Sequence, residues 1–161
     1  MRHGNARWLV TGLVGIALSV LASVTTISTS SAGTDVDLRM GVYPDADAFA
    51  FGGGLLTDIG HTSNWYFNPN LEIAMADTRN LMILSGDFHY DFGATSNLSI
   101  WAGGGPAMLV NDPDHGDTST DFGLNALMGL GARSGNVRPF GQIRGTIADH
   151  SQLALEGGIR F

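Results

Sequence analysis

The sequence predicts an all-β protein: an eight-stranded antiparallel up-and-down transmembrane β-barrel that follows a cleaved signal peptide. Three observations predict this class. Apolar and polar residues alternate with a period of two, as they do in strands whose two faces meet different surroundings. The alternating segments run about 9–13 residues, close to the roughly 9–11 of a transmembrane strand. Charged residues make up only 14% of the chain and lysine is absent, which leaves little for a water-facing coat.

Residues 1–32 have the three parts of a secretory signal peptide. Arg2 and Arg7 give a positive start, residues 8–22 are apolar without a charge, and residues 23–32 are small and polar. The apolar run of about 15 residues is shorter than the roughly 20 that a membrane-spanning helix needs, so we expect cleavage rather than an anchor. The predicted domains are a signal peptide at 1–32 and a barrel at 33–161.

The composition excludes several classes of function. Cysteine is absent, which excludes disulfides, thiolate catalysis and cysteine-ligated metals. After cleavage the chain would keep six arginines and all 15 acidic residues. We expect no nucleic-acid partner for so acidic a chain.

Four strands are predicted in the first half, at residues 35–43, 48–59, 65–76 and 81–92, with turn residues between them. Each places large apolar side chains on one face and small or polar ones on the other. The apolar face of these strands consists of Val36, Leu38, Met40, Val42, Phe49, Phe51, Leu55, Ile59, Trp65, Phe67, Leu71, Ile73, Met75, Met82, Leu84, Phe88, Tyr90 and Phe92.

Four more strands are predicted at residues 98–110, 121–133, 137–148 and 151–161. Their apolar face consists of Leu98, Ile100, Ala102, Met108, Val110, Phe122, Leu124, Ala126, Met128, Leu130, Ile143, Ile147, Leu153, Leu155, Gly157, Ile159 and Phe161. Pro69 and Pro106 fit poorly because each deletes a ladder hydrogen bond, and we expect bulges there. Trp101 and Phe140 are large residues that fall on the polar face.

The alternation does not say which face is outside, because a soluble lipocalin-like barrel alternates too. The export signal and the small, lysine-free polar face favour an apolar face turned to lipid. Aromatic residues also gather at the strand ends that would meet a membrane interface, where their rings are favoured. These residues are Trp65, Phe67, Tyr90, Phe92 and Phe161.

The polar face of such a barrel is predicted to form a network inside the lumen. Its members are Asp37, Arg39, Glu72, Asp87, His89, Asp91, Asn125, Arg133, Gln142, Arg144, Glu156 and Arg160. An eight-stranded barrel is only wide enough for side chains to fill, so these charges must pair with one another. We expect a salt-bridged plug without an open pore; an ion path or a catalytic cluster is the alternative interpretation.

Several segments resemble small outer-membrane β-barrel families of the opacity-type and OmpA/OmpX-like kind. They are Tyr-Asp-Phe-Gly at 90–93, Ala-Gly-Gly-Gly-Pro at 102–106, Arg-Pro-Phe-Gly-Gln-Ile-Arg at 138–144, and the final Phe161. The resemblance implies a location in the Gram-negative outer membrane, with the lipid bilayer as partner and both termini in the periplasm. It also implies that Phe161 belongs to the insertion signal read by the barrel-assembly machinery. It does not imply one activity.

Two clusters could carry chemistry. The acidic loop after residue 110 offers weak metal candidates in Asp112, Asp114, Asp117 and Asp121, but it fails the EF-hand pattern, so we expect a solvated loop and no metal or cofactor. His150, Ser151 and Glu156 resemble the Ser-His-Glu set of an outer-membrane lipid A deacylase. Adjacent strand residues point to opposite faces, however, and a nucleophile must touch its base. We therefore expect no enzyme.

The function predicted from the sequence is that of a non-enzymatic outer-membrane barrel with a plugged lumen and a structural or surface-interaction role. Three alternatives remain: a narrow channel, a lipid-modifying enzyme, and a soluble exported barrel that binds a ligand.

Overall fold

The structure is a computed structural model that describes residues 33–59, 64–77, 79–93, 95, 97–113 and 117–161. The predicted signal peptide and its cleavage site lie outside these residues. Within the described part of the chain, no helix is long and apolar enough to cross a membrane.

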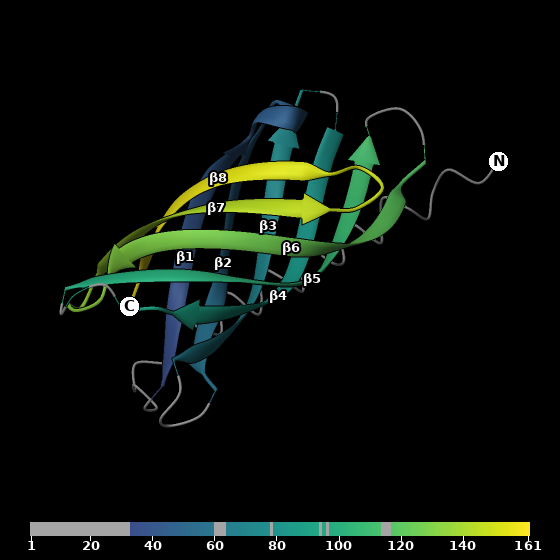
Figure 1. The fold of residues 1–161 in the computed structure, drawn as a ribbon. Coiled ribbons are helices and arrows are strands. Elements are labelled where there is room, and N and C mark those ends of the chain that lie inside the picture. The colour runs from purple at the N-terminus through teal and green to yellow at the C-terminus, as the bar shows by residue number, and fades with distance from the viewer. Residues whose placement is uncertain (1–32, 60–63, 78, 94, 96, 114–116) are drawn as a thin grey trace. The chain divides into compact units, whose positions relative to one another are not determined.

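The described residues form eight strands and one short 3₁₀ turn, η1 (Pro44–Ala46). The strands are β1 (Thr34–Tyr43), β2 (Ala48–Asp58), β3 (Trp65–Ala76), β4 (Arg79–Asp91), β5 (Leu98–Pro113), β6 (Ser119–Ala132), β7 (Arg138–Ile147) and β8 (Gln152–Arg160). Each strand pairs antiparallel with the next, and β8 pairs antiparallel with β1 to close a barrel (Figure 1). The predicted eight-stranded antiparallel barrel is confirmed. The main difference is the β5–β6 hairpin, where both strands extend into the segment predicted as an acidic loop.

The closing seam between β1 and β8 runs to the end of the described chain. Asp37 lies opposite Arg160 in the register of the two strands. Beyond that pair, the backbone N–H of Val36 donates to the carbonyl of Phe161 at 2.9 Å, and the N–H of Phe161 donates back at 3.0 Å. Phe161 is therefore a structural part of the seam.

The two faces of the barrel have opposite chemistry. Large apolar side chains point outward. Phe122 is 75% exposed, and large apolar side chains at alternating positions of every strand are exposed as well. The buried residues inside the barrel include seventeen polar or charged ones. The predicted orientation of the alternating faces is confirmed, with the apolar side chains outside.

Aromatic rings pack against one another on the outer face of β3 and β4. Trp65 lies 5.2 Å from Tyr90 between ring centroids, and Tyr90 lies 5.0 Å from Phe92. These residues lie at the end of the barrel where β1 begins and β8 ends, which we call the terminal end. Their position agrees with a membrane-interface belt, since rings with wet tips favour that depth.

The bulges expected at the two prolines are absent from the described strands. Pro69 lies opposite Gly86 and Pro106 opposite Leu124, and the pairing keeps one register on both sides of each proline. A side chain replaces the hydrogen bond missing at Pro69. The carbonyl of Leu55, which faces Pro69 across β2 and β3, accepts a hydrogen bond of 2.8 Å from Nδ2 of Asn68. The ladder is thus interrupted locally without an extra residue.

Glycines make room for the two large aromatic residues inside the barrel. Trp101 lies opposite Gly129, and Phe140 lies opposite Gly158. A Cβ at Gly129 would lie 2.5 Å from Cζ2 of Trp101, and one at Gly158 would lie 2.5 Å from Cζ of Phe140. The aromatic rings therefore occupy the volume that side chains at these two positions would fill.

Replacing Gly129 with valine should lower the free energy of unfolding by about 1–3 kcal/mol, because an overpacked interior must displace Trp101. Urea unfolding of the barrel in lipid vesicles, followed by tryptophan fluorescence, measures the change. The matched control is Gly141→Val, where the nearest atom to a new Cβ, Glu156 O, is 3.8 Å away. Equal losses in both variants would contradict the packing argument.

Deleting Phe161 should destabilise the barrel by about 1–3 kcal/mol, because two backbone hydrogen bonds of the seam are lost. Phe161→Leu retains both bonds and should stay close to wild type. Refolding into vesicles without any assembly factor separates this effect from a role in insertion. If both variants unfold at the wild-type urea concentration, Phe161 does not contribute to the closing seam.

Candidate functional site

The interior of the barrel holds a continuous network of charged and amide side chains, which we call the lumen network. It is built from inward positions of β1, β3, β4, β6, β7 and β8. Its members are Asp37, Arg39, Tyr43, Asn68, Asn70, Glu72, Ser85, Asp87, Asn125, Gln142, Arg144, Thr146 and Glu156. All are buried, because every second residue of a strand turns into an interior too narrow for bulk water.

Arg39 joins β1 to β3 and β8. Its Nε and Nη2 both donate to Oδ1 of Asp37, at 2.9 and 2.7 Å, and Nη2 also reaches the side-chain oxygen of Asn68 at 2.8 Å. Its Nη1 lies 3.5 Å from Glu72 and 3.6 Å from Glu156. A planar guanidinium can hold several oxygens at once in this way.

Arg144 of β7 lies beside the same two glutamates. Its Nη2 is 2.6 Å from Oε1 of Glu72 and 2.7 Å from Oε1 of Glu156, and its side chain is 0% exposed. Nη2 also donates to the hydroxyl of Tyr43 at 2.8 Å, and that hydroxyl donates to Oε2 of Glu72 at 2.9 Å. Arg144 therefore ties together strands from opposite parts of the chain.

Asp87 is held mainly by neutral donors. Nδ2 of Asn125 donates to its Oδ1 at 2.8 Å, and Nδ2 of Asn70 donates to its Oδ2 at 3.0 Å. Thr146 in turn donates to the amide oxygen of Asn125 at 2.7 Å. The lumen network has four carboxylates and two arginines, so the amides and hydroxyls supply the donors that the arginines do not.

Gln142 connects the lumen network to the aromatic pair inside the barrel. Its Nε2 donates to Oε2 of Glu156 at 2.8 Å, and its Oε1 accepts from the indole nitrogen of Trp101 at 3.4 Å. The second contact is long. The ring of Trp101 also lies parallel to that of His89, with 6.3 Å between the two centroids.

The structure places eight of the residues proposed from sequence in the lumen network: Asp37, Arg39, Glu72, Asp87, Asn125, Gln142, Arg144 and Glu156. His89, Asp91 and Arg160 are also buried, but they lie nearer the terminal end. Arg133 is a correction to the expected set. It is exposed, because β6 ends at Ala132 and Arg133 continues into the turn, where its N–H donates to Asn97.

The sequence analysis missed five members of the lumen network: Ser85 and Thr146, which contact Asn125, and also Tyr43, Asn68 and Asn70. Their positions in the alternation could have indicated that they point inward, since Tyr43 lies on the same face of its strand as Asp37 and Arg39. Which residues they touch depends on the register between strands, which the sequence does not display.

The two clusters considered for chemistry do not come together as sites. Asp112 lies in β5 and accepts a hydrogen bond of 2.8 Å from Thr118, while Asp121 lies 3.4 Å from Nδ1 of His150. Asp114 lies outside the described residues. Among the described residues, no group of three His, Asp or Glu has metal-binding geometry.

The Ser-His-Glu resemblance is not matched by contacts. Oγ of Ser151 donates to the carbonyl of Ala148 at 3.4 Å, His150 faces Asp121, and Glu156 is buried in the lumen network. The base and the hydroxyl thus have different partners, so this arrangement does not activate a nucleophile.

The chain matches no protein-family model and no curated protein sequence. Its structure is similar to the N-terminal β-barrel domain of Pseudomonas aeruginosa OprF, with a TM-score of 0.69 and 16% identity over 80% of this chain and 96% of that one. It is also similar to Neisserial surface protein A, with a TM-score of 0.60 and 18% identity over 79% and 92% of the two chains. Ail, the attachment invasion locus protein of Yersinia pestis, matches with a TM-score of 0.52 and 11% identity over 80% and 99%.

These neighbours are small eight-stranded outer-membrane β-barrels. At such low identity the likeness shows the fold alone. The fold predicted from the sequence is therefore confirmed.

Replacing Arg144 with glutamine should cost about 3–5 kcal/mol of unfolding free energy, because Glu72 and Glu156 would remain buried without their shared cation. The measurement is equilibrium urea unfolding in vesicles. The control is Arg138→Gln, whose pair with Asp35 at 2.6 Å is 20% and 31% exposed. That change should cost less than about 1 kcal/mol.

The triple variant Arg144→Gln, Glu72→Gln, Glu156→Gln should recover part of the lost stability, since it removes the unpaired charges together with the arginine. A triple variant less stable than Arg144→Gln alone would contradict the charge-pairing account.

Proposed function

We propose that this protein is an integral outer-membrane barrel with a lumen closed by the lumen network, and that it has a structural or surface-interaction role rather than a role in transport. The observation that carries the proposal is the pair of buried arginines, Arg39 and Arg144, each in contact with Glu72 and Glu156 from opposite parts of the barrel wall. Side chains that meet across the interior support a closed lumen.

The outer face supports the membrane part of the proposal. A soluble barrel keeps its large apolar side chains inside, whereas here Phe122, Leu124, Met128 and Ile147 are exposed, and Arg39, Arg144 and Arg160 are buried. Apolar side chains facing outward lose nothing in contact with acyl chains. The same surface in water would be an aggregation hazard.

The burial of the charges supports the closed lumen. The side chains of Arg39, Glu72, Arg144 and Glu156 are almost fully buried. A passing ion would have to separate contacts as short as 2.6 Å between Arg144 and Glu72. Removing one partner from a buried pair costs several kcal/mol, so we expect thermal opening to be rare.

Two further parts of the proposal rest on the sequence. Residues 1–32 are proposed to be a signal peptide removed during export, because their charge and hydropathy follow that pattern. No enzymatic role is proposed, since His150 and Ser151 contact other groups than each other.

Planar-bilayer recording tests the closed lumen. At 100 mV the purified barrel should give no more current steps than an empty bilayer gives. A known pore-forming protein added to the same bilayer should give regular steps. Regular steps from the wild-type barrel, lost on heating, would show a channel and overturn the closed-lumen proposal.

Fractionation tests the location separately. The protein should sediment with the outer membrane, and its unboiled form should migrate differently from its boiled form on a gel. A soluble periplasmic protein with unchanged mobility would contradict membrane insertion.

A further inference from the structure

The terminal end of the barrel contains a pocket that the lumen network does not fill. It has a volume of about 170 Å³, and we call it the terminal pocket. Arg160, His89, Trp101 and Arg133 line it together with Asp35 and Asp91. This volume corresponds to roughly five water molecules, which suits a small polar group.

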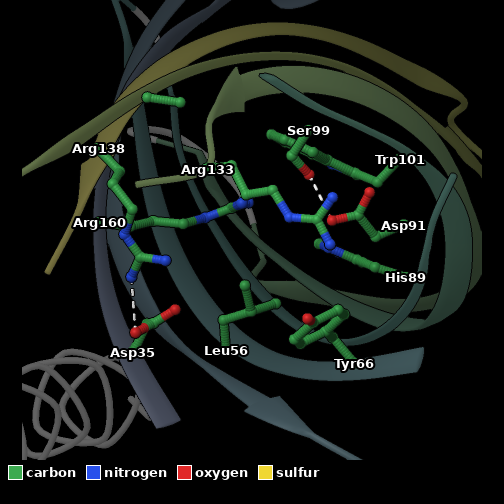
Figure 2. A pocket seen from close by; sticks show the side chains of 11 residues that line it. Asp35, Leu56, Tyr66, His89, Asp91, Ser99, Trp101, Arg133, Arg138 and Arg160 are labelled. Atoms are coloured by element: carbon green, nitrogen blue, oxygen red, sulfur yellow. Dashed lines mark hydrogen bonds and ion pairs between the residues drawn. The ribbon is translucent and has the colours of Figure 1, made fainter. Parts of the chain in front are cut away.

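Arg160 is held in a fixed position at the wall of the pocket. Its guanidinium carbon lies 4.3 Å from the centroid of the Trp101 ring and 4.4 Å from that of Phe140. Stacking on two rings fixes the plane of the group and leaves its N–H donors directed away from the rings. Figure 2 shows the side chain reaching from the barrel wall into the pocket.

Two of the three guanidinium nitrogens of Arg160 have no hydrogen-bond partner among the described residues. Its Nε and Nη2 are buried and have no hydrogen-bond partner within the described part of the chain, and the residue is 7% exposed. These two nitrogens form one edge of the guanidinium, the fork that binds two oxygens of a carboxylate or phosphate side by side. A buried donor without a partner is costly, so this edge is a strong candidate for a ligand contact.

His89 provides a second unpartnered nitrogen on the same pocket. Its Nε2 also lacks a partner among the described residues, and the residue is 2% exposed. In Figure 2 its ring points into the pocket. Two buried nitrogens from β4 and β8 thus face one space.

The carboxylates that line the terminal pocket already have partners. Asp35 pairs with Arg138 at 2.6 Å. Asp91 accepts hydrogen bonds from Oγ of Ser99 at 2.7 Å and from the N–H of Gly93 at 2.7 Å. They weaken the positive field of the pocket without occupying the fork of Arg160, so we expect binding of modest strength.

We infer that the terminal pocket binds a small anion through a carboxylate or phosphate group, whose two oxygens accept from Nε and Nη2 of Arg160 while Nε2 of His89 donates a further hydrogen bond. Arg133 stands exposed at the rim and attracts the anion to the opening. If both termini lie in the periplasm, as the resemblance to small outer-membrane barrels implies, the pocket faces the periplasm, so the ligand is either a free periplasmic anion or the phosphate of a lipid headgroup. The inference concerns the terminal end alone and does not require a closed lumen.

Titration of the folded barrel with sodium phosphate and with sodium acetate, at constant ionic strength in chloride, tests the inference. The readouts are the ¹⁵Nε–H resonance of Arg160 and the fluorescence of Trp101, which stacks on it. We expect a saturable change with a midpoint on the order of 1 mM for at least one of the two anions. A linear response equal to that of chloride would overturn the inference.

Variants assign the site. Arg160→Gln should weaken binding about tenfold or more, read from Trp101. If that variant does not fold, Arg133→Gln decides, because Arg133 is exposed and should still raise the midpoint. The matched control is Arg79→Gln in β4 at the opposite end of the barrel, which should leave the titration unchanged. If phosphate or acetate binding has the same midpoint in every folded variant of the terminal end, the anion binds elsewhere and the assignment is refuted.

A third titration identifies the source of the anion. Short-chain phosphatidic acid that binds at least tenfold tighter than inorganic phosphate would assign the pocket to a lipid headgroup, and equal affinity would assign it to a free anion. Bilayer recording gives an independent outcome. A barrel that conducts ions and still shows saturable phosphate binding would refute the closed lumen but support the anion site in the terminal pocket.

Discussion

The pairing of Arg39 and Arg144 with buried carboxylates is the interaction on which the rest of the structure depends. A closed barrel with a lipid-compatible outside must put its polar residues inside, and an interior of this width cannot hydrate them. Each charge therefore needs a partner inside the barrel, either on its own strand, as Arg39 provides for Asp37, or on another strand, as Arg144 provides for Glu72. That requirement fixes the phase of the strands that carry the charges, since a one-residue slip would move the charges to the outer face.

The fold and the face of each strand could be predicted because both are encoded locally. A period of two is visible in a single strand, and the contrast between Phe122 or Leu124 and Asn125 needs no knowledge of neighbours. Location in a membrane followed from composition and from the aromatic end of β3. The burial of Arg39 and Glu156 followed from the same alternation.

What could not be predicted depends on which residues meet across strands. Leu55 lies opposite Pro69 only in the folded register, so the amide of Asn68 was not recognised as a substitute for the missing backbone donor. Trp101 is a second example. In the sequence it is a large residue on the polar face, whereas in the fold it packs against Gly129 of the neighbouring strand. Arg133 was misassigned because alternation does not reveal where a strand stops.

The seam between β1 and β8 has a consequence for biogenesis. Every other strand pairs with a neighbour in the sequence, but the outer edge of β1 has no native partner until β8 has been synthesised and delivered. Until then the sheet has an unpaired edge beside an apolar outer face, a combination prone to aggregation in water. We therefore expect the barrel to close in one final step, when β8 pairs with β1.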